Sequence, residues 1–408
     1  MTVANNKRIF YACQAVAIAA EGSAASLTSG NMVHGAQSIG LTTNFNLEQA
    51  FELSQIEIYE NIEGTPDVEV TMEKLLDGYP LMYHMATTGI VGTAQSGLAA
   101  RSDVKCDVRL GIFDASANNV AGATDNAGDS EVEVYCSGMF VSNVSYTIPV
   151  DGNSTESITL VGNNKQWLTG ANTNIVTGDV GSFDGTDKPK ALPQGLDQDA
   201  NSGGGIQRRE DVLLSGCILP TSINGVVGTD YGNGLAADGT PIVHIQNFTC
   251  SVDLGREDIL ELGRKTPYFR PANFPVEVTC EFEAITTSGD FVGAYEFGDP
   301  ALDPTEASGN NLSDENIFMV LRAGYAFDMG NKNKLSSVSY GGGDAGGGNA
   351  TCSYSYSNFN QFDVQAYNDQ ELIGFGGITK GLGFDGNGLA NAGAGTNAHG
   401  PFPANLVI

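Results

Sequence analysis

Two short segments carry the residues of this sequence whose types and spacing could do acid–base chemistry. They read PDVEVTMEKL (66–75) and FPVEVTCEFE (274–283). The candidate residues are Glu69, Glu73, Glu277, Glu281 and Glu283. Two carboxyl groups can act as general acid and general base when their environments differ. Here several carboxylates alternate along one segment, which indicates an acidic surface more than a tuned pair.

Both segments alternate apolar and polar residues with a period of two. In the later segment one parity is apolar, and its members are Val276, Val278, Cys280 and Phe282. Successive side chains of a β-strand point to opposite faces of the sheet. Each segment is therefore expected to be a strand with one apolar and one acidic face. The stretches 55–60 and 131–136 show the same alternation.

The composition favours an all-β protein that does not bind the phosphate groups of nucleic acids. The chain has 408 residues, with 48 acidic and 19 basic side chains and a formal net charge of −29. A nucleic-acid-binding protein needs clustered Lys and Arg, which this balance argues against. The 53 glycines, together with many Asn, Ser and Thr, are typical of a fold with many turns.

The sequence shows no motif for catalysis, a cofactor or a metal ion. The seven cysteines are spread out without a Cys-x-x-Cys pair, and the four histidines are isolated. The loop 113–130 departs from the spacing of a calcium loop, and 374–383 lacks the end of a phosphate-binding loop. We therefore expect no enzyme, no cofactor and no metal site. Cysteines at 136, 250, 280 and 352 are expected to be small buried hydrophobes, with disulfides as the alternative.

We do not expect the apolar runs to form a membrane span or a signal peptide. No run reaches 18 apolar residues. The first residues, MTVANNKRIFYACQAVAIAAEGSAAS, resemble a signal peptide superficially, with Lys7 and Arg8 before an apolar run. That run contains Tyr11, Cys13 and Gln14, so we expect it to be a first strand instead.

The chain is expected to contain two tandem β-domains, because its strand patterns recur. An offset of 203 places Asn44-Phe45 on Asn247-Phe248, and after an insertion of five residues 68–71 falls on 276–279. A looser match pairs 143–164 with 337–358. We predict domain 1 at 1–168, a Gly/Asp/Asn-rich linker or long loop at 169–205, domain 2 at 206–370 and a Gly/Asn-rich C-terminal arm at 371–408.

Helix is expected to be scarce. The best candidates are 77–89, where Pro80 suits a first helical turn, and 256–265, which ends at Gly263. Each domain is therefore predicted to be a β-sandwich or half-barrel with one short helix on its flank. His84 lies in the first candidate helix and is expected to be a partly buried histidine with its hydrogen bonds satisfied.

Two segments resemble the tail tube proteins, or major tail proteins, of tailed bacteriophages, in a duplicated two-domain form. They are 247–290, containing NFTCSVDLGREDILELGRK, and 141–167, containing VSNVSYTIPVDGNSTESITLVGNNK. The resemblance touches both predicted domains and covers roughly 9–167 and 206–360. The glycine-rich stretch 341–348 departs from the pattern, which puts the outer sheet of the second domain in doubt.

The resemblance implies a structural virion protein that assembles with itself. Tail tube subunits are β-sandwiches whose inner sheets join into a ring barrel, while loops and termini connect the stacked rings. The usual ring has six single-domain chains, so a two-domain chain implies a homotrimeric, pseudo-hexameric ring. The channel would deliver the genome, and its acidic wall would repel DNA, which passes without specific binding.

The resemblance also implies partners and a location. The partners would be further copies of the chain, the tape measure protein, the tail terminator, baseplate or distal tail proteins and, in a contractile tail, a sheath protein. The protein would be found in the virion tail after assembly in the cytoplasm of the bacterial host. Alternatives are another tail ring component (terminator or distal tail) and a secreted β-sandwich adhesin or carbohydrate-binding protein, for which Trp167 is weak support.

The five glutamates are expected to face the lumen of such a channel. The alternative is that they face bulk solvent on an outer sheet. A contractile and a non-contractile tail are both compatible with these residues, as are free cysteines and cysteines that join subunits. The segments 169–205 and 381–408 are expected to contact other subunits or other rings.

Overall fold

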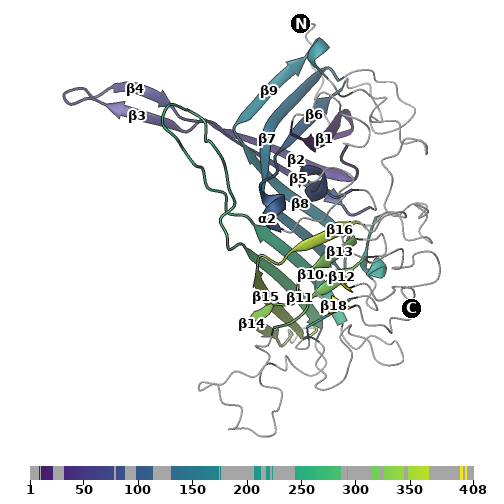
Figure 1. The fold of residues 1–408 in the computed structure, drawn as a ribbon. Coiled ribbons are helices and arrows are strands. Elements are labelled where there is room, and N and C mark those ends of the chain that lie inside the picture. Colours follow the sequence, from purple (N-terminus) through teal and green to yellow (C-terminus); the bar gives the residue numbers. More distant parts are fainter. Residues whose placement is uncertain are drawn as a thin grey trace.

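The computed structural model is mainly β, as the sequence predicts (Figure 1). It describes residues 9, 11–21, 32–77, 80–87, 98–113, 130–173, 175, 206–212, 217–220, 223, 244–285, 292, 314–321, 325–343, 348–366, 396–397 and 400–401. The α-helices of this part are α1 (Met82–Thr87) and α2 (Leu98–Ser102), and 3-10 turns lie at Tyr11–Cys13, Gly170–Asn172 and Arg209–Asp211. The strands are β1 (Gln14–Ala20), β2 (Ala36–Asn44), β3 (Leu47–Phe51), β4 (Ile58–Glu63), β5 (Asp67–Leu75), β6 (Cys106–Ile112), β7 (Val132–Pro149), β8 (Thr155–Gly162), β9 (Asn164–Thr169), β10 (His244–Asp253), β11 (Glu277–Ile285), β12 (Phe318–Val320), β13 (Tyr325–Asp328), β14 (Lys334–Gly341), β15 (Thr351–Phe359), β16 (Asp363–Ala366), β17 (Thr396–Asn397) and β18 (Gly400–Pro401).

One antiparallel sheet runs through the whole molecule. Its main path has the strand order β14-β15-β11-β10-β7-β8-β5-β2. The strands before residue 170 and those after residue 240 meet where β7 pairs with β10. The described part of the path ends with β2 at one edge and β14 at the other.

The two halves of this path have the same topology. In chain order, the four strands of the first half are arranged first-second-fourth-third, as β2-β5-β8-β7, and those of the second half likewise, as β10-β11-β15-β14. Both first strands have a register shift at a glutamine, Gln37 and Gln246. Both third strands have one at a serine, Ser142 and Ser336. Such bulges add one residue to one strand of a pair, so they fix which residues of the two halves correspond.

These bulges correct the offsets expected from the sequence. They place Gln37 on Gln246, an offset of 209 and not 203. They also place Glu73 on Glu283, so that the matched segments 68–71 and 276–279 are two positions out of register. Both errors are even numbers of residues, which preserves the side of the strand on which each residue lies. The match of 143–147 with 337–341 agrees with the observed register.

The expected alternation of buried and exposed residues is present. On β5 the buried residues are Val68, Val70, Met72 and Lys74, and on β11 they are Val278, Cys280, Phe282 and Ala284. Strands β8 and β15 likewise share one burial pattern over 155–162 and 351–358. The sheet therefore has a covered face, which carries the core, and an open face.

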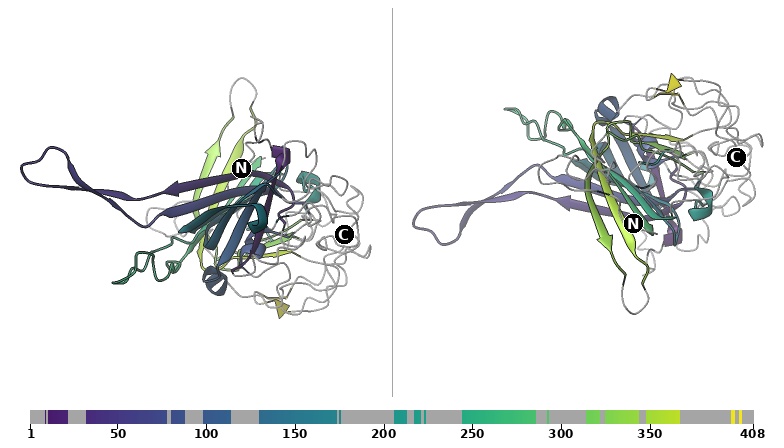
Figure 2. Two further views of the ribbon diagram at one scale, coloured as in Figure 1. Left: turned by 90° about the horizontal axis from the view of Figure 1, so that it is seen from above. Right: turned by 90° about the horizontal axis from the view of Figure 1, so that it is seen from below.

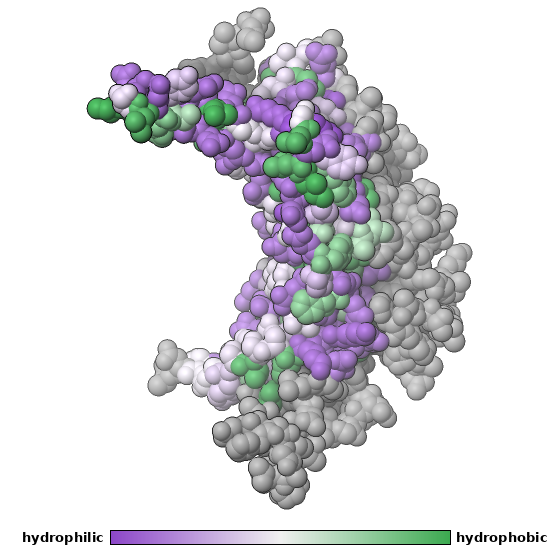
Figure 3. Space-filling view, turned by 60° about the vertical axis from the view of Figure 1, so that its left-hand side comes forward, coloured by the Kyte–Doolittle hydropathy of each residue, from purple (hydrophilic) through white to green (hydrophobic). Residues whose placement is uncertain are grey.

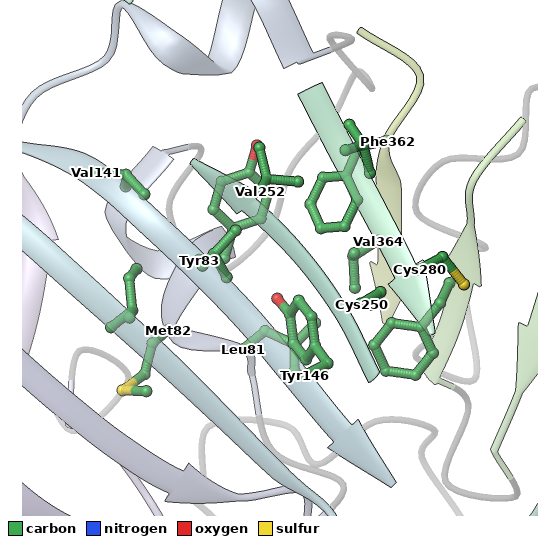
Figure 4. Close-up of a cluster of buried hydrophobic side chains, with 14 of the residues drawn as sticks. Leu81, Met82, Tyr83, Val141, Tyr146, Cys250, Val252, Cys280, Phe362 and Val364 are labelled. Atoms are coloured by element: carbon green, nitrogen blue, oxygen red, sulfur yellow. The ribbon is translucent and has the colours of Figure 1, made fainter. Parts of the chain in front are cut away.

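The core on the covered face continues across the joint between the halves. Tyr146 of β7 packs against Phe327 of β13 with 4.9 Å between ring centroids, and Phe248 against Phe282 with 5.0 Å. Figure 4 shows Leu81, Met82 and Tyr83 of the α1 region meeting side chains from β7, β10 and β11 and from the β16 region. All seven cysteines are buried thiols, which confirms the interpretation of the four in alternating patterns. Burial raises the pKa of the Cys136 thiol to about 11.

A second layer of short strands covers this core. The long strand β7 pairs with β8 and β10 through its later residues, and with β6 and β9 through its earlier ones. Strand β1 extends this layer by pairing with β6, so the apolar run near the start of the sequence does form a strand. Over the second half, β12, β13 and β16 form a three-stranded sheet.

Only one of the two predicted helices is present. Helix α1 lies within 77–89; its Met82 and Met85 are buried, and so is Leu81 just before it. The helix predicted at 256–265 is wrong, because this segment is not helical: Ile259 makes a bridge to Phe269, and the chain turns between Glu261 and Arg264. Its apolar residues find no core surface on which an amphipathic helix could pack, and short helices are marginal without such packing.

Several sequence predictions fall wholly or mostly outside the described residues. These concern the loop 113–130, the linker 169–205, the glycine-rich segment 374–383 and the C-terminal arm 371–408. From that arm the structure describes the two-stranded pair β17–β18.

Candidate functional site

The open face of the sheet is the first candidate functional surface. Its strands carry mainly hydroxyl, amide and carboxylate side chains. The central strands β7 and β10 present Asn143, Ser145, Thr147, Asn247, Thr249, Ser251 and Asp253. Strands β8 and β15 add Thr155, Ser157, Thr159, Thr351, Ser353, Ser355 and Ser357. Such a face is hydrated and offers phosphate groups few cationic partners.

All five sequence-predicted glutamates lie on this open face. They alternate with buried residues, with Glu69, Glu277 and Glu281 exposed and Glu73 and Glu283 partly exposed. They form two groups, one on β5 and one on β11. Strands β8, β7 and β10 separate these groups, which corresponds to about 19 Å at ordinary strand spacing.

The neighbours of these glutamates do not form a catalytic pair with them. Across the ladders, Glu73 lies opposite Ser38 and Ser157, and Glu281 lies opposite Thr249 and Ser355. The direct partners of the other three are likewise hydroxyl, amide or apolar residues. No acid or base lies opposite any of the five in these described ladders. The arrangement is two acidic stripes separated by polar strands.

The open face is concave. Figure 3 shows the molecule hollowed on this side, with mostly hydrophilic side chains lining the hollow. A right-handed strand twist and the paired bulges bend a long sheet in this way. A concave, polar and acidic surface that spans eight strands can form part of the wall of a wide, water-filled space.

Two extended arms form the second candidate surface. Arm 1 (45–66) joins the first and second strands of the first half and contains the β3–β4 pair, and arm 2 (254–275) occupies the same place in the second half. Both project from one side of the sheet (Figures 1 and 2). They share details: Asn46 and Gly255 at their starts have φ angles of 49° and 50°.

The tips of the arms are matched and carry exposed leucines. Phe51-Glu52-Leu53-Ser54 corresponds to Leu260-Glu261-Leu262-Gly263. Ser54 and Gly263 both have left-handed φ angles, 82° and 88°, so both tips turn in the same way. Leu53 is 96% exposed and Leu262 is 104% exposed. Each tip also exposes a neighbouring large apolar residue, Phe51 or Leu260, and exposed apolar residues that gather in this way are typical of a contact surface.

The apolar exposure extends along both arms. Large apolar side chains exposed on arm 1 are Phe45, Leu47, Phe51, Leu53, Ile56, Ile58, Tyr59 and Ile62. Those on arm 2 are Ile259, Leu260, Leu262, Tyr268 and Phe274. Together these make up most of the large exposed hydrophobic residues in the described part of the chain. This surface was not predicted from the sequence, although 51–62 combines apolar residues with acidic ones.

Ion pairs fix the arms at their roots. Arg270 Nη2 donates to Asp67 Oδ1 at 2.6 Å and to Asp258 Oδ2 at 2.9 Å, and thereby links the two halves. Thr65 Oγ1 of arm 1 donates to the backbone carbonyl of Lys265 in arm 2. Arg256 donates to the carbonyl of Val141 at the β7 bulge, and burial lowers its pKa to about 10. The roots are thus held in place while the tips extend into solvent.

A buried polar cluster fixes α1 to the first half. The carboxylate of Glu156 accepts the N–H groups of Met82 at 2.7 Å and Tyr83 at 3.0 Å, and the hydroxyl of Tyr146 at 2.9 Å. Burial raises its pKa, and the charge of Lys74 opposes that shift. In the second half Cys352 corresponds to Glu156. The cluster therefore belongs to the first half and holds a helix in place.

His84 is buried in α1, as expected. Its Nε2 lies 2.6 Å from the carbonyl oxygen of Val364, which connects α1 to β16 of the second half. Burial lowers the pKa of His84 to about 3, with a further contribution from Arg101.

The described residues contain no metal site. No cluster of three or more His, Cys, Asp or Glu side chains among them could hold a metal ion. In the same part of the chain, no helix has the length and apolar character needed to cross a membrane.

Comparisons with known proteins find similarity at the level of solved structures. No family model matches the sequence, and no curated protein matches it. A structure of the tube-terminating cap of the anti-feeding prophage is 15% identical, covering 42% of this chain and 97% of that chain, with a TM-score of 0.28. A sheath–tube complex of an extracellular contractile injection system is 10% identical, covering 41% and 96%, with a TM-score of 0.28. An Hcp protein is 9% identical, covering 38% and 98%, with a TM-score of 0.22. At these TM-scores the matches establish neither a family nor a function for this chain.

Proposed function

We propose that this chain is a structural tube protein of a phage-tail-like particle. Three copies close into a ring, their sheets join into one barrel, and rings stack into a tube. The carrying observation is the eight-strand main path of the sheet, which repeats one strand order and its bulges twice along a concave polar face. Such a sheet has exposed edges, and closure into a ring is the arrangement that removes them.

The repeated order and bulges support an internal duplication with two tail-tube-like domains, 1–168 and 206–370. The segments 169–205 and 371–408 then serve as linker and arm between subunits or rings. In this proposal the chain has a structural role and no catalytic one. Its partners are further copies, the tape measure, terminator and baseplate or distal tail proteins and, in a contractile tail, a sheath. It resides in the virion tail and assembles in the host cytoplasm.

The open face would form the wall of the channel. Glu69, Glu73, Glu277, Glu281 and Glu283 then face the lumen together with the Ser and Thr residues around them. A wall that carries carboxylates and hydroxyl groups repels the phosphates of passing DNA, so the DNA does not adhere. Each ring of three chains would present six acidic stripes.

The arms supply the contact between rings. They extend past the end of the sheet and carry exposed apolar residues at their tips, so a second ring is the natural partner for them. Burial of these leucines and aromatic residues would stabilise stacking.

Electron microscopy of the purified full-length chain tests the proposal. We expect rings with a central hole wide enough for duplex DNA, which stack into tubes as concentration rises. In native particles, a tube protein should be among the most abundant components, whereas a terminator forms a single ring. A chain that stays monomeric at every concentration would contradict the proposal.

A charge-reversal experiment tests the role assigned to the wall. Glu73→Lys combined with Glu283→Lys should make the rings retain duplex DNA, and retention should fall steeply as salt rises. A matched control reverses the same number of charges on the arm tips, Glu52→Lys with Glu261→Lys, and should retain less DNA in its channel.

A further inference from the structure

The two edge strands, β2 and β14, provide the basis for an inference about how copies join. The sheet path ends with these strands. Strand β2 holds the same place in the first half as β10 in the second, and β14 the same place as β7. Inside the chain, β7 and β10 already pair with one another. The internal joint therefore shows how a β14 edge and a β2 edge fit together.

We propose that β14 of one copy pairs antiparallel with β2 of the next copy, in the register of the internal β7–β10 pair. This deepens the proposed function and rests on it, because it assigns the joint of the ring. Each residue of β10 in the internal pair is replaced by its counterpart on β2, and each residue of β7 by its counterpart on β14. The resulting pairs are Gly40↔Gly341, Leu41↔Tyr340, Thr42↔Ser339, Thr43↔Val338 and Asn44↔Ser337. The partner is thus a second copy of this chain.

The exposure of the edge residues supports this joint. Tyr146 is fully buried on β7, where it lies opposite Cys250, but its counterpart Tyr340 on the β14 edge is 55% exposed. Leu41, the counterpart of Cys250, is half-buried and already contacts the core. Pairing Tyr340 with Leu41 would cover both apolar side chains, as the internal joint covers their counterparts.

The residues of the two edges that lie on the open face also match those of the internal joint. Thr42 and Ser339 correspond to Ser251 and Ser145, which face each other on the open face of the internal joint. Asn44 and Ser337 correspond to Asp253 and Asn143. The joint between copies therefore carries small hydroxyl and amide groups, and the concave polar face continues from one copy to the next. The described edges contain no Pro, the residue that commonly prevents strands from pairing.

Cysteine pairs test the register directly. The matched double variants are Thr42→Cys with Ser339→Cys and Asn44→Cys with Ser337→Cys. The exchanged variants are Thr42→Cys with Ser337→Cys and Asn44→Cys with Ser339→Cys. Directly opposite Cβ atoms lie about 5 Å apart and diagonal ones about 7 Å or more, and a disulfide requires about 4 Å. The native thiols are buried, so they give a low background.

After mild oxidation of the assembled protein, the matched variants should give crosslinked bands of two and three chains on non-reducing gels. The exchanged variants should give markedly less. If wild-type rings form but the exchanged variants crosslink better than the matched ones, the register is wrong while the tube function stands. If wild-type protein forms no rings and no variant crosslinks, both fail.

Amide hydrogen exchange on the wild-type protein provides a measurement that needs no variant. The backbone N–H groups of 38–44 and 337–341 that point away from β5 and β15 should become protected on assembly. Equivalent groups on β7 and β10 should be protected before and after. Rings that form without new protection in both edges would overturn the proposed joint.

Discussion

Glu156 is a buried charge whose role is structural. Its carboxylate accepts two backbone N–H groups at the start of α1 and the hydroxyl of Tyr146, and the ammonium of Lys74 opposes its burial cost. Buried charges are stable in a protein only when such partners are present. The residue therefore fixes a short helix that could not form alone.

Replacing Glu156 should destabilise the fold. Glu156→Ala leaves two helix N–H groups and a phenol without their acceptor and removes the negative charge near the buried Lys74, so we expect a loss of about 3 kcal/mol in the free energy of unfolding. Glu69→Ala on the open face is the matched control and should change stability by less than about 0.5 kcal/mol. Urea denaturation monitored by circular dichroism measures both. Equal effects would show that the cluster contributes little.

His84 should make stability depend on pH. Its pKa is about 3 in the folded chain and 6.5 when exposed, so the unfolded chain binds a proton more readily between these values. The contribution of His84 is complete above about pH 6.5 and is lost as the pH falls towards 3, by an amount on the order of a few kcal/mol.

The control for this prediction is a histidine on the surface. His84→Gln should flatten the stability profile between pH 6.5 and 5, a range above the titration of most carboxylates. His244→Gln, at an exposed position on β10, should leave the profile unchanged. A profile unaffected by His84→Gln would contradict this account of the His84–Val364 contact.

At the scale of elements, the two arms are matched projections built on the same turn. Gln55 donates its N–H to the carbonyl of Glu52 at 3.3 Å, and Arg264 donates to Glu261 at 3.4 Å in the corresponding turn. Both turns place a leucine at full exposure. A conformation repeated in two dissimilar sequences indicates a shared constraint, and contact with another ring would supply one.

Substitution at both tips should weaken stacking and spare the rings. Leu53→Ser with Leu262→Ser removes apolar groups that are almost fully exposed, so folding and ring formation should be unchanged. Tubes should become several-fold shorter or require higher protein concentration, as measured by electron microscopy and sedimentation. Trp167→Ser, at an exposed aromatic residue on β9 that belongs to neither arm, is the control. Full-length tubes from the double variant would exclude the tips as the stacking contact.

The strands of the sheet could be predicted from the sequence, whereas the two arms could not. Period-two alternation identified β5 and β11 and the common face of their glutamates, because burial on one side of a sheet enforces that pattern. It failed at 256–265, where Ile259, Leu260 and Leu262 have helical spacing but face solvent. In the proposed assembly their environment is set by contacts outside the chain, which local pattern does not encode.

The candidate site, too, could be predicted from the sequence only in part. The alignment of the halves was off by six residues in one segment and by two in another, because identities are few and strand patterns tolerate even shifts. Only the bulges at Gln37 and Gln246 fix the register. Glu156 in the alternating stretch TESITLVG was indistinguishable from a surface glutamate, since its partners on α1 lie more than 70 residues away in the sequence.

At the scale of the whole molecule, the acidic charge, the curvature of the sheet and its two edge strands all support the proposed ring. The formal net charge of −29 lies partly in two acidic stripes on the concave side of one long sheet. In the described part of the chain, the main path of the sheet ends in two strands that match the pair at its own centre. In the proposed function such a molecule is one segment of a ring, and its arms are the parts that would contact a further ring.

An electron cryomicroscopy reconstruction of the assembled protein tests this central claim most directly. We predict rings of three chains whose sheets form one continuous barrel, with Glu73 and Glu283 on the inner wall and both arms contacting the next ring. Rings in which the open face points outward, or in which β2 and β14 of neighbouring copies do not meet, would contradict the account.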